Sequence, residues 1–219
     1  AQAHETRDLL AATYPSLADP DAIEIVALTT TGDKVQDRPL SEVGGKGVFT
    51  KELDEALFDG RIDVGVHSMK DVPTWLPDGL VLPCMLARED VRDVMVSPRY
   101  ASFADMPAGS VVGTTSLRRQ AQVLARYPEL KVVIFRGNVQ TRLRKLDEGE
   151  ADATLLALAG LNRLDMAHVA AAVLEPHDLL PAVGQGAIGM TCRADDAATI
   201  KTVAALDHVM AVAIQADHI

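Results

Sequence analysis

Apolar stretches with the spacing of strands alternate with amphipathic stretches along this chain, and this alternation restricts the fold more than any other feature. Apolar residues at every second position indicate a strand, whereas apolar residues roughly three to four positions apart indicate a helix. The strand-like stretches are residues 22–30, 61–67, 79–87, 109–114, 130–135, 151–159 and 187–192, and the helix-like stretches are residues 49–60, 116–128, 138–149 and 195–210. Alternation at this spacing is typical of βαβ units and predicts an α/β fold with largely parallel sheets.

Two segments are predicted to cross between two lobes. The charge-rich residues 87–96 would lead the chain out of a first lobe, and residues 179–193 would return it. Two lobes joined by two crossovers would form a hinged cleft. Ligands of open α/β sheets bind outside the carboxyl ends of the strands, so we expect binding residues where strands end.

The composition is that of an ordinary globular protein, with 219 residues, 48% of them apolar and 24% charged. No apolar run reaches the roughly 18–20 residues that a membrane span requires, and no secretory signal is visible, although a targeting segment could have been removed. Cys84 and Cys192 lie far apart and have no metal-ligand spacing. We therefore predict two buried thiols, no metal site and a reducing, cytoplasmic environment.

Basic residues are concentrated in one part of an acidic chain. The formal net charge is −10, yet residues 113–145 contain eight basic residues against one acidic residue, a local charge of +7 that leaves −17 for the remainder. The overall charge argues against a polyanion-binding surface covering the molecule. Nucleic acid is a poor candidate for the basic stretch, because only Tyr127 and Phe135 are available there for base stacking.

Arginines recur at the starts of two predicted helices. In "GTTSLRRQ" a strand ends at Gly113, hydroxyls from Thr114 to Ser116 can cap the next helix, and Arg118 and Arg119 fall in its first turn. Cations there oppose the helix dipole unless an anion is bound. The stretch "FRGNVQTR" repeats the arrangement one unit later, with Arg136 and Arg142 around a turn at Gly137 and Asn138. Two adjacent strand ends would direct guanidinium groups at one region, which suits a ligand with carboxylates.

The stretch "VGVHSMKDVP" places polar side chains at the end of another predicted strand. Asp71 lies at the carboxyl end, where ligands are expected, and Pro73 breaks any helix that Asp71 could cap. A binding or catalytic site is one interpretation. A strand-to-turn joint with a capping Ser68 or Asp71 and a solvated Lys70 is the other, and His67 alone is typical of a satisfied core histidine.

Two glycine-rich stretches resemble nucleotide motifs without fitting them. "GQGAIG" has the GxGxxG spacing, but the residues after Gly186 read as a strand rather than a helix, so we predict a glycine turn with unusual backbone angles. "VGGKGVF" lacks the frame of a phosphate-binding loop. Residues 29–47 read as a long polar loop, either a lid or an ordinary surface loop.

Longer stretches of the chain resemble one family. Residues 42–73, 112–122, 135–164 and 180–193 are together similar to hydroxymethylbilane synthases, also called porphobilinogen deaminases, and the resemblance extends from Ala1 to about His208. It implies two hinged lobes like those of type II periplasmic binding proteins, each with a mixed, mostly parallel sheet, and a third α+β domain. Domain 1 would comprise residues 1–88 and 187–207, domain 2 residues 92–182, and residues 208–219 would begin a largely absent domain 3.

The resemblance implies a transferase of tetrapyrrole and heme biosynthesis. Such enzymes join four porphobilinogen molecules head to tail, release ammonia each time and produce hydroxymethylbilane. They extend a dipyrromethane cofactor that is bound through a thioether to a cysteine of the third domain. Neither Cys84 nor Cys192 has the context of that cysteine, so we expect the attachment residue, like the family's N-terminal strand, outside this chain. A cytoplasmic monomer without nucleic-acid or membrane partners is also expected.

Individual residues take their expected roles from the same resemblance. Asp71 corresponds to the catalytic aspartate, whose carboxylate would stabilise the cation that forms on a pyrrole nitrogen when ammonia leaves. His67 would be structural. The expected cofactor and substrate contacts are Ser68, Lys70, Thr114, Ser116, Arg118, Arg119, Arg136, Gly137, Arg142, Arg163 and Gln185, with Lys46 and Phe49 on a mobile loop. A two-lobed module that binds small carboxylates without catalysis remains the alternative.

Overall fold

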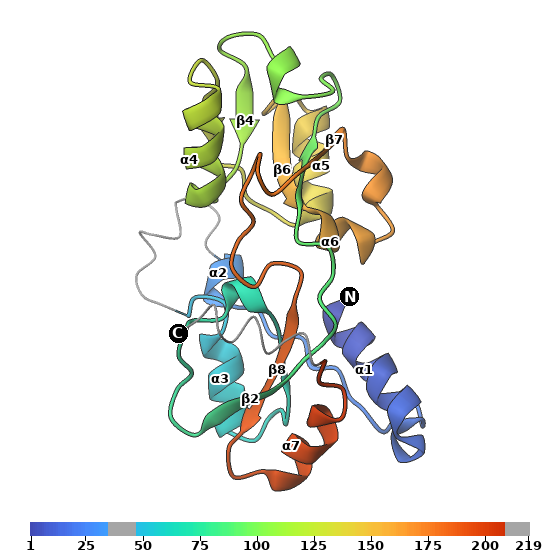
Figure 1. The fold of residues 1–219 in the computed structure, drawn as a ribbon. Coiled ribbons are helices and arrows are strands. Elements are labelled where there is room, and N and C mark those ends of the chain that lie inside the picture. The colour runs from blue at the N-terminus through green and yellow to red at the C-terminus, as the bar shows by residue number, and fades with distance from the viewer. Residues whose placement is uncertain (35–46, 209–219) are drawn as a thin grey trace. The chain divides into compact units, whose positions relative to one another are not determined.

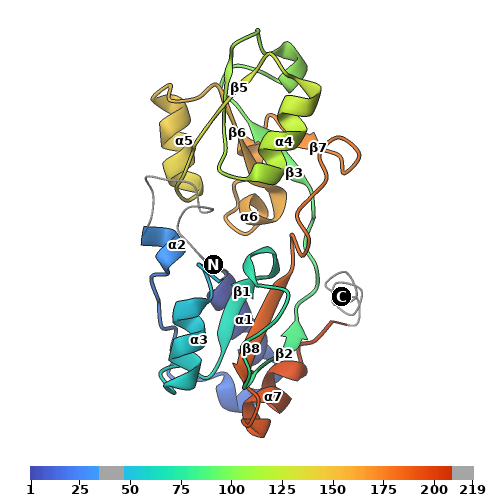
Figure 2. The same cartoon turned by 90° about the vertical axis from the view of Figure 1, so that its left-hand side faces the viewer.

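The computed structural model describes residues 1–34 and 47–208, which separate into two compact units. The first unit contains residues 1–34, 47–89 and 186–208, and the second contains Asp90–Gln185. Figures 1 and 2 show their elements in two orthogonal views. The first unit is therefore discontinuous in sequence, because the chain leaves it to form the second unit and then returns to it.

A three-stranded antiparallel sheet forms the centre of the first unit. Its order is β1 (Gly65–Ser68), β8 (Ile188–Arg193) and β2 (Leu80–Met85), and β8 is antiparallel to both neighbours. All but the last residue of β8 are buried, which agrees with its position between two strands. Helices α3 (Lys51–Phe58) and α7 (Ala197–Ala204) contact this sheet, and α1 (Gln2–Thr13) contacts β1. The short helix α2 spans Thr31–Lys34.

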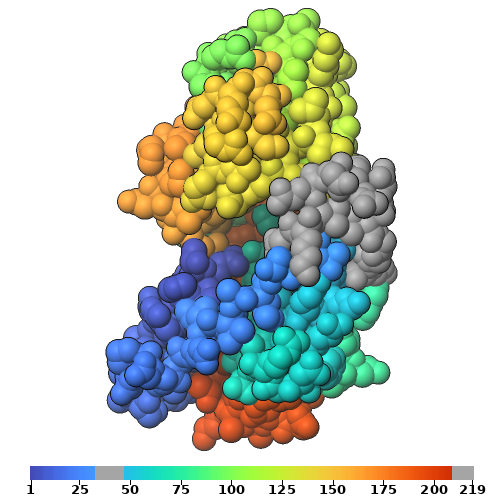
Figure 3. Space-filling view, turned by 180° about the vertical axis from the view of Figure 1, so that it is seen from behind, coloured from blue at the N-terminus to red at the C-terminus, as the bar shows by residue number. Residues whose placement is uncertain are grey.

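The predicted strand at residues 22–30 is wrong, because no strand is assigned there. The parallel arrangement predicted for this unit is likewise absent from its described ladders. Residues 24–30 follow an irregular path, and Figure 3 shows the segment after α1 on the surface, in blue, beside the cyan α3. Ile23, Ile25 and Leu28 instead line a cavity. An alternating apolar pattern determines which side chains face the protein interior, but a strand also needs the edge of a neighbouring strand with which its backbone can form hydrogen bonds.

The second unit contains a mixed five-stranded sheet in the order β5-β4-β6-β3-β7. Strand β4 (Val111–Gly113) is parallel to β5 (Lys131–Val133) and β6 (Ala153–Ala157), whereas β3 (Asp93–Val96) is antiparallel to β6 and β7 (Ala172–Leu174). Helix α4 (Leu117–Arg126) follows β4, α5 (Val139–Asp147) follows β5 and α6 (Leu158–Asn162) follows β6. The α/β alternation predicted for this part of the chain is confirmed.

Two buried clusters cover the opposite faces of this sheet. Met95 and Leu155 belong to one cluster, whereas their chain neighbours Val94 and Leu156 belong to the other. Successive side chains of a strand point to opposite faces, so both faces of β3 and β6 are buried. This burial explains why the two strands read as continuous apolar runs.

Several boundaries differ from the sequence prediction. Residues 93–96, predicted as part of a crossing, form the fully buried strand β3, and β7 was not predicted at all. Helix α6 begins inside the stretch predicted as one strand over residues 151–159. A short apolar run is not long enough to show whether its period is that of a strand or of a helix, so the neighbouring strands decide which of the two it forms.

Short 3₁₀ helices occupy Pro15–Leu17, Met69–Asp71, Phe103–Asp105 and Ala167–Val169.

The glycine turn predicted at "GQGAIG" is confirmed. Gly184 and Gly186 have φ angles of 67° and 88°, in the left-handed region that glycine adopts most readily, and β8 rather than a helix follows. The helix predicted over residues 49–60 forms as α3 and ends before Gly60, whose φ of 67° also lies in the left-handed region. Within residues 1–34 and 47–208, no helix has both the length and the apolar character needed to cross a bilayer.

Candidate functional site

The turn that carries Lys70 and Asp71 is anchored by the residue before them. Strand β1 ends at Ser68, and Met69–Asp71 form one 3₁₀ turn. Met69 is buried, and its N–H donates to the Ala187 carbonyl at 3.0 Å. Glycine is required at position 189, because a Cβ there would collide with the Met69 side chain. With Met69 held inward, Lys70 and Asp71 are exposed at the strand end.

A cavity of about 710 Å³ in the first unit collects several of the expected site residues. Ser68, Asp71 and Phe49 line it. The Gln2 Nε2 group donates to Ser68 Oγ at 2.7 Å, so α1 positions this hydroxyl. Lys70 does not line the cavity, and Lys46 lies outside the described residues. The side chains from β1, its 3₁₀ turn and residue 49 are thus brought to one place within the first unit.

In the second unit, α4 begins with the cap that the sequence predicted. Ser116 is the N-cap residue, and its Oγ accepts a hydrogen bond from the Arg119 N–H at 3.4 Å. The hydroxyl of the buried Thr114 accepts from the Ser116 N–H at 3.2 Å. Arg118 and Arg119 therefore occupy the first turn of the helix, where the backbone dipole disfavours positive charge.

Asp93 compensates both of these arginines and was missed by the sequence analysis. Its carboxylate is fully buried, and it accepts from Arg118 Nη2 and from Arg119 Nη2, each at 2.7 Å. Gln185 Nε2 donates to the same carboxylate at 2.9 Å. Burial alone would raise the pKa of Asp93, but the two guanidinium groups hold it below its ordinary value. The anion that the helix start requires is thus supplied by the protein itself.

The position of Asp93 follows from the direction of β3. Because β3 is antiparallel to β6, its first residue, Asp93, lies opposite Ala157, the last residue of β6. Strand β4 is parallel to β6 and ends at the same edge of the sheet, where α4 begins. A parallel β3 would have placed Asp93 at the other edge. The only sequence signal was an acidic residue at the start of the short apolar run "DVMV".

Gln185 was expected to contact a ligand, and the structure gives it a supporting position. It is almost completely buried, and its Nε2 also donates to the Val91 carbonyl at 2.7 Å. The Arg118 Nη2 group lies 3.4 Å from its Oε1 atom. These contacts connect Gln185 to Asp93 and to the arginine that Asp93 binds. Arg163, another expected contact, is half-buried and follows α6 as its C-cap residue.

The second arginine pair lies near the first. The half-buried Arg142 donates through Nε to the Gly137 carbonyl at 2.9 Å. Burial lowers the pKa of Arg142 to about 10, and the positive charges of Arg119 and Arg136 contribute to the shift. Such mutual repulsion indicates that the guanidinium groups are close together. We call Arg118, Arg119, Arg136 and Arg142 the arginine cluster.

The arginine cluster retains capacity for an anion. One carboxylate, that of Asp93, serves both Arg118 and Arg119. Arg119 is only 6% exposed, and its Nε atom is buried without a hydrogen-bond partner, although its Nη1 donates to the Leu155 carbonyl at 2.9 Å. A buried donor without a partner is costly and rare in proteins. A bound carboxylate would supply the acceptor that Arg119 Nε lacks.

Both cysteines are buried, as predicted. Burial, with a contribution from Asp207, raises the pKa of the Cys84 thiol to about 12, and burial also raises the pKa of Cys192. Neither thiol has the accessible, low-pKa character of a reactive cysteine. Over the described parts of the chain, no group of histidine, cysteine, aspartate and glutamate side chains is arranged to hold a metal ion.

The fold resembles that of a solved two-lobed binding protein. The periplasmic substrate-binding protein of an ABC transporter from Coxiella burnetii matches with a TM-score of 0.54 and 12% identity, covering 100% of this chain and 94% of that one. At this identity the likeness concerns the fold alone. It confirms the predicted fold class, two lobes that resemble type II periplasmic binding proteins.

Sequence comparisons give a closer relationship. The family model "Porphobilinogen deaminase, dipyromethane cofactor binding domain" matches residues 1–201. The chloroplastic porphobilinogen deaminase of Oryza sativa subsp. japonica is 61% identical over 208 residues, which are 95% of this chain and 58% of that protein. The porphobilinogen deaminase of Paracoccus denitrificans is 58% identical over 206 residues, which are 94% of this chain and 65% of that protein. The chain thus spans less than two thirds of these relatives, and it belongs to the porphobilinogen deaminase family.

Proposed function

We propose that this chain is the part of a porphobilinogen deaminase that carries the catalytic aspartate and the carboxylate-binding arginines. The whole protein would join four porphobilinogen molecules head to tail, release ammonia and form hydroxymethylbilane for tetrapyrrole biosynthesis. The observation that carries the proposal is the arginine cluster, a group of neighbouring guanidinium groups in a chain with a net charge of −10, in which the buried Arg119 Nε donor has no hydrogen-bond partner. Porphobilinogen carries an acetate and a propionate arm, so each added ring brings two carboxylates.

The residues of the second unit fit the dipyrromethane cofactor of the family. Its side arms are carboxylates, and the unpartnered Arg119 Nε is a donor that such a group can satisfy. Arg136 and Arg142 would hold further carboxylates, because the positive charges of Arg119, Arg136 and Arg142 lie close together and a guanidinium group pairs well with a carboxylate. When bound, the cofactor supplies the pyrrole ring to which the first substrate unit is added.

Arg118 and Arg119 are held in fixed orientations before any ligand binds. Arg118 donates through Nη1 to the Leu180 carbonyl and through Nη2 to Asp93, and Arg119 uses both Nη atoms for protein acceptors. Donors that are already oriented need little rearrangement when charge arrives. We therefore assign Asp93 and Gln185 to positioning the arginines and the arginines to binding the carboxylates.

Asp71 is the group that we assign to catalysis. When ammonia leaves porphobilinogen, positive charge develops on the substrate and is shared with its pyrrole nitrogen. A carboxylate that accepts a hydrogen bond from this N–H stabilises the charge without forming a covalent bond. Asp71 is exposed on the wall of the 710 Å³ cavity, in the 3₁₀ turn after β1, and the buried Met69 at the start of that turn fixes its backbone position.

The test is turnover by full-length protein in which Asp71→Asn is compared with Asp78→Asn, an exposed aspartate outside this cavity. We expect Asp71→Asn to lower porphobilinogen consumption and ammonia release by on the order of 100-fold, as removal of one preorganised electrostatic group does. Cofactor content, measured by intact mass, should stay unchanged. Bilane production at the level of Asp78→Asn would refute the assignment.

A second variant tests the arginine cluster. Arg119→Leu should reduce both cofactor retention and turnover, because it removes the buried donor aimed at a carboxylate. Unchanged retention and turnover would contradict the binding role. If the unaltered full-length protein binds porphobilinogen without consuming it or releasing ammonia, the chain is a carboxylate-binding module rather than part of an enzyme.

We further propose a cytoplasmic monomer whose partner is porphobilinogen rather than nucleic acid or a membrane. The two buried, unpaired thiols support a reducing compartment. Gel filtration with light scattering would test the monomer directly.

A further inference from the structure

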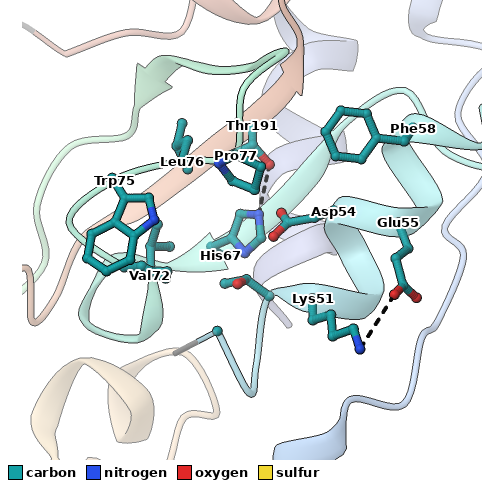
Figure 4. Close-up of a pocket in the computed structure, with 13 residues that line it drawn as sticks. Lys51, Asp54, Glu55, Phe58, His67, Val72, Trp75, Leu76, Pro77 and Thr191 are labelled. Carbon is teal, nitrogen blue, oxygen red and sulfur yellow. Dashed lines mark hydrogen bonds and ion pairs between the residues drawn. The ribbon is translucent and has the colours of Figure 1, made fainter. Parts of the chain in front are cut away.

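A second cavity in the first unit has a composition unlike that of the carboxylate-binding region. Its volume is about 300 Å³, and it shares only His67 with the larger cavity that Asp71 lines. One wall comes from the apolar side chains of the loop after Asp71, and another comes from the first turns of α3. Figure 4 shows Trp75, Val72 and Leu76 on one side and Asp54 on the α3 side, with the ring of His67 lying among them.

The α3 wall presents the half-buried carboxylate of Asp54, which no described residue pairs with a positive charge. Burial raises the pKa of Asp54, and the Thr50 hydroxyl partly offsets this effect by donating a hydrogen bond. Lys51 lies on the same wall but pairs with Glu55 at 3.8 Å. No ion pair to Asp54 is found among the described residues. A half-buried carboxylate with only a neutral donor gains most from a bound cation.

His67 does not provide that cation. It is 5% exposed, and its Nε2 atom forms a hydrogen bond of 2.8 Å with Thr191 Oγ1. Burial lowers the pKa of His67 to about 4, so the ring is neutral near pH 7. Its ring lies beside the Asp54 carboxylate in Figure 4 and forms part of the floor of the cavity. The sequence assigned His67 a structural role, and the bond to Thr191 is consistent with one.

Aromatic side chains stand at the margin of the same cavity. Trp75 and Phe58 line it and are 54% and 51% exposed. Large aromatic surfaces provide contact area for ligand rings, and the face of a tryptophan attracts cations. A small apolar cavity with a few oriented polar groups is the usual form of a small-molecule site. Its volume lies at the lower end of the range for such sites, about 300–1,000 Å³, and restricts the ligand to about one ring.

We propose that this cavity binds a small aromatic ammonium ion, with the ring against Trp75 and the ammonium group donating to the Asp54 carboxylate. The acidic groups Asp54 and Glu55 outnumber Lys51 on the wall, so ligands with carboxylates are disfavoured. Porphobilinogen and the dipyrromethane cofactor carry carboxylates, so this wall disfavours both as occupants. The site is independent of the function proposed above and would stand if that function failed.

The chain contains a single tryptophan, Trp75, so its fluorescence reports on this cavity alone. The experiment titrates the full chain with benzylamine, with benzyl alcohol as an uncharged ligand of the same ring and with benzoate as the anionic counterpart. We expect a saturable change with benzylamine, at least about tenfold weaker binding of benzyl alcohol and no saturable change with benzoate, because the charged hydrogen bond to Asp54 is lost in both. Equal binding of all three, or no saturable change with benzylamine, would overturn the proposal.

Two matched variants locate the ammonium contact. Asp54→Asn should weaken benzylamine binding at least about tenfold and leave benzyl alcohol binding nearly unchanged. The control is Asp59→Asn, which removes the same charge just after α3 at an exposed position that does not line the cavity. Equal benzylamine affinities in the two variants would refute the role of Asp54. If Asp54→Asn fails to fold, the comparison of benzylamine, benzyl alcohol and benzoate on the unaltered protein still tests the proposal.

Discussion

Replacing Asp93 with asparagine tests how far one buried carboxylate organises the second unit. The substitution keeps the size of the side chain and removes the negative charge that Arg118 and Arg119 share at 2.7 Å. Asparagine can still accept hydrogen bonds, but it brings an NH₂ group toward one of these guanidinium donors. Arg119, at 6% exposure, cannot turn to solvent without opening the sheet edge.

The expected loss of unfolding free energy is about 3–5 kcal/mol, the range for breaking a buried ion pair by removing one partner. Most of it is the cost of leaving a guanidinium buried without a counter-charge, rather than the worth of the pair itself. The lowered pKa of Asp93 determines how its contribution to stability changes with pH. Its stabilising contribution is present above the ordinary value of about 3.9 and disappears as the pH falls through the lowered pKa.

Asp178→Asn is a matched control, because Asp178 also pairs with an arginine, Arg126, at 2.7 Å. Both of those side chains are 46% exposed, so solvent screens the pair and the loss should be much smaller. Urea unfolding followed by circular dichroism measures both variants. Hydrogen exchange should show faster exchange in β3 and β6 for Asp93→Asn and no change in β2 and β8, which belong to the other unit. Equal unfolding midpoints for the two variants would refute the reasoning.

Two further predictions concern the stability of each unit. His67 should make the first unit less stable by about 3 kcal/mol as the pH falls from about 6.5 to 4, because the unfolded chain binds the proton first while the folded ring stays neutral. Urea unfolding followed by Trp75 fluorescence should show the unfolding free energy falling with pH in the unaltered chain but not in His67→Gln. Equal dependence on pH in the two proteins would contradict the prediction. In the second unit, Gly113→Ala should lower the unfolding free energy by about 1–3 kcal/mol, because its Cβ would collide with the Phe135 ring at the end of β4. Gly160→Ala, in α6 with open space around it, should instead raise the unfolding free energy by about 0.4–1 kcal/mol, and calorimetry that ranks the two glycine variants the other way would be inconsistent with the packing described.

Local features of the candidate site were predictable from the sequence. The cap at Ser116, the arginines in the first turn of α4, the glycine turn before β8 and the exposed Asp71 after a strand all depend on residues close to one another in the chain. A cap or a turn is decided by the conformations and hydrogen bonds of about four residues, which a sequence pattern displays directly. The roles of these residues remain proposals that the variants above can test.

The non-local features could not be predicted in the same way. The alternating pattern at residues 22–30 predicts a strand, yet those residues form none, whereas "DVMV", predicted as part of a crossing, forms the buried strand β3. In both cases the outcome depends on which strand edge lies alongside, and that edge comes from a distant part of the chain. The sequence also showed an anion requirement at the start of α4 without showing what would meet it.

What the sequence determined by itself is therefore the α/β class, the local caps and turns, and the concentration of arginines in an acidic chain. The tertiary structure alone decided that Asp93, more than twenty residues before Arg118, neutralises the arginines at the start of α4. The reason is the antiparallel direction of β3, which places the first residue of that strand at the edge where β4 and β6 end. Strand direction is set by how the whole sheet is assembled, and no short stretch of the chain encodes it.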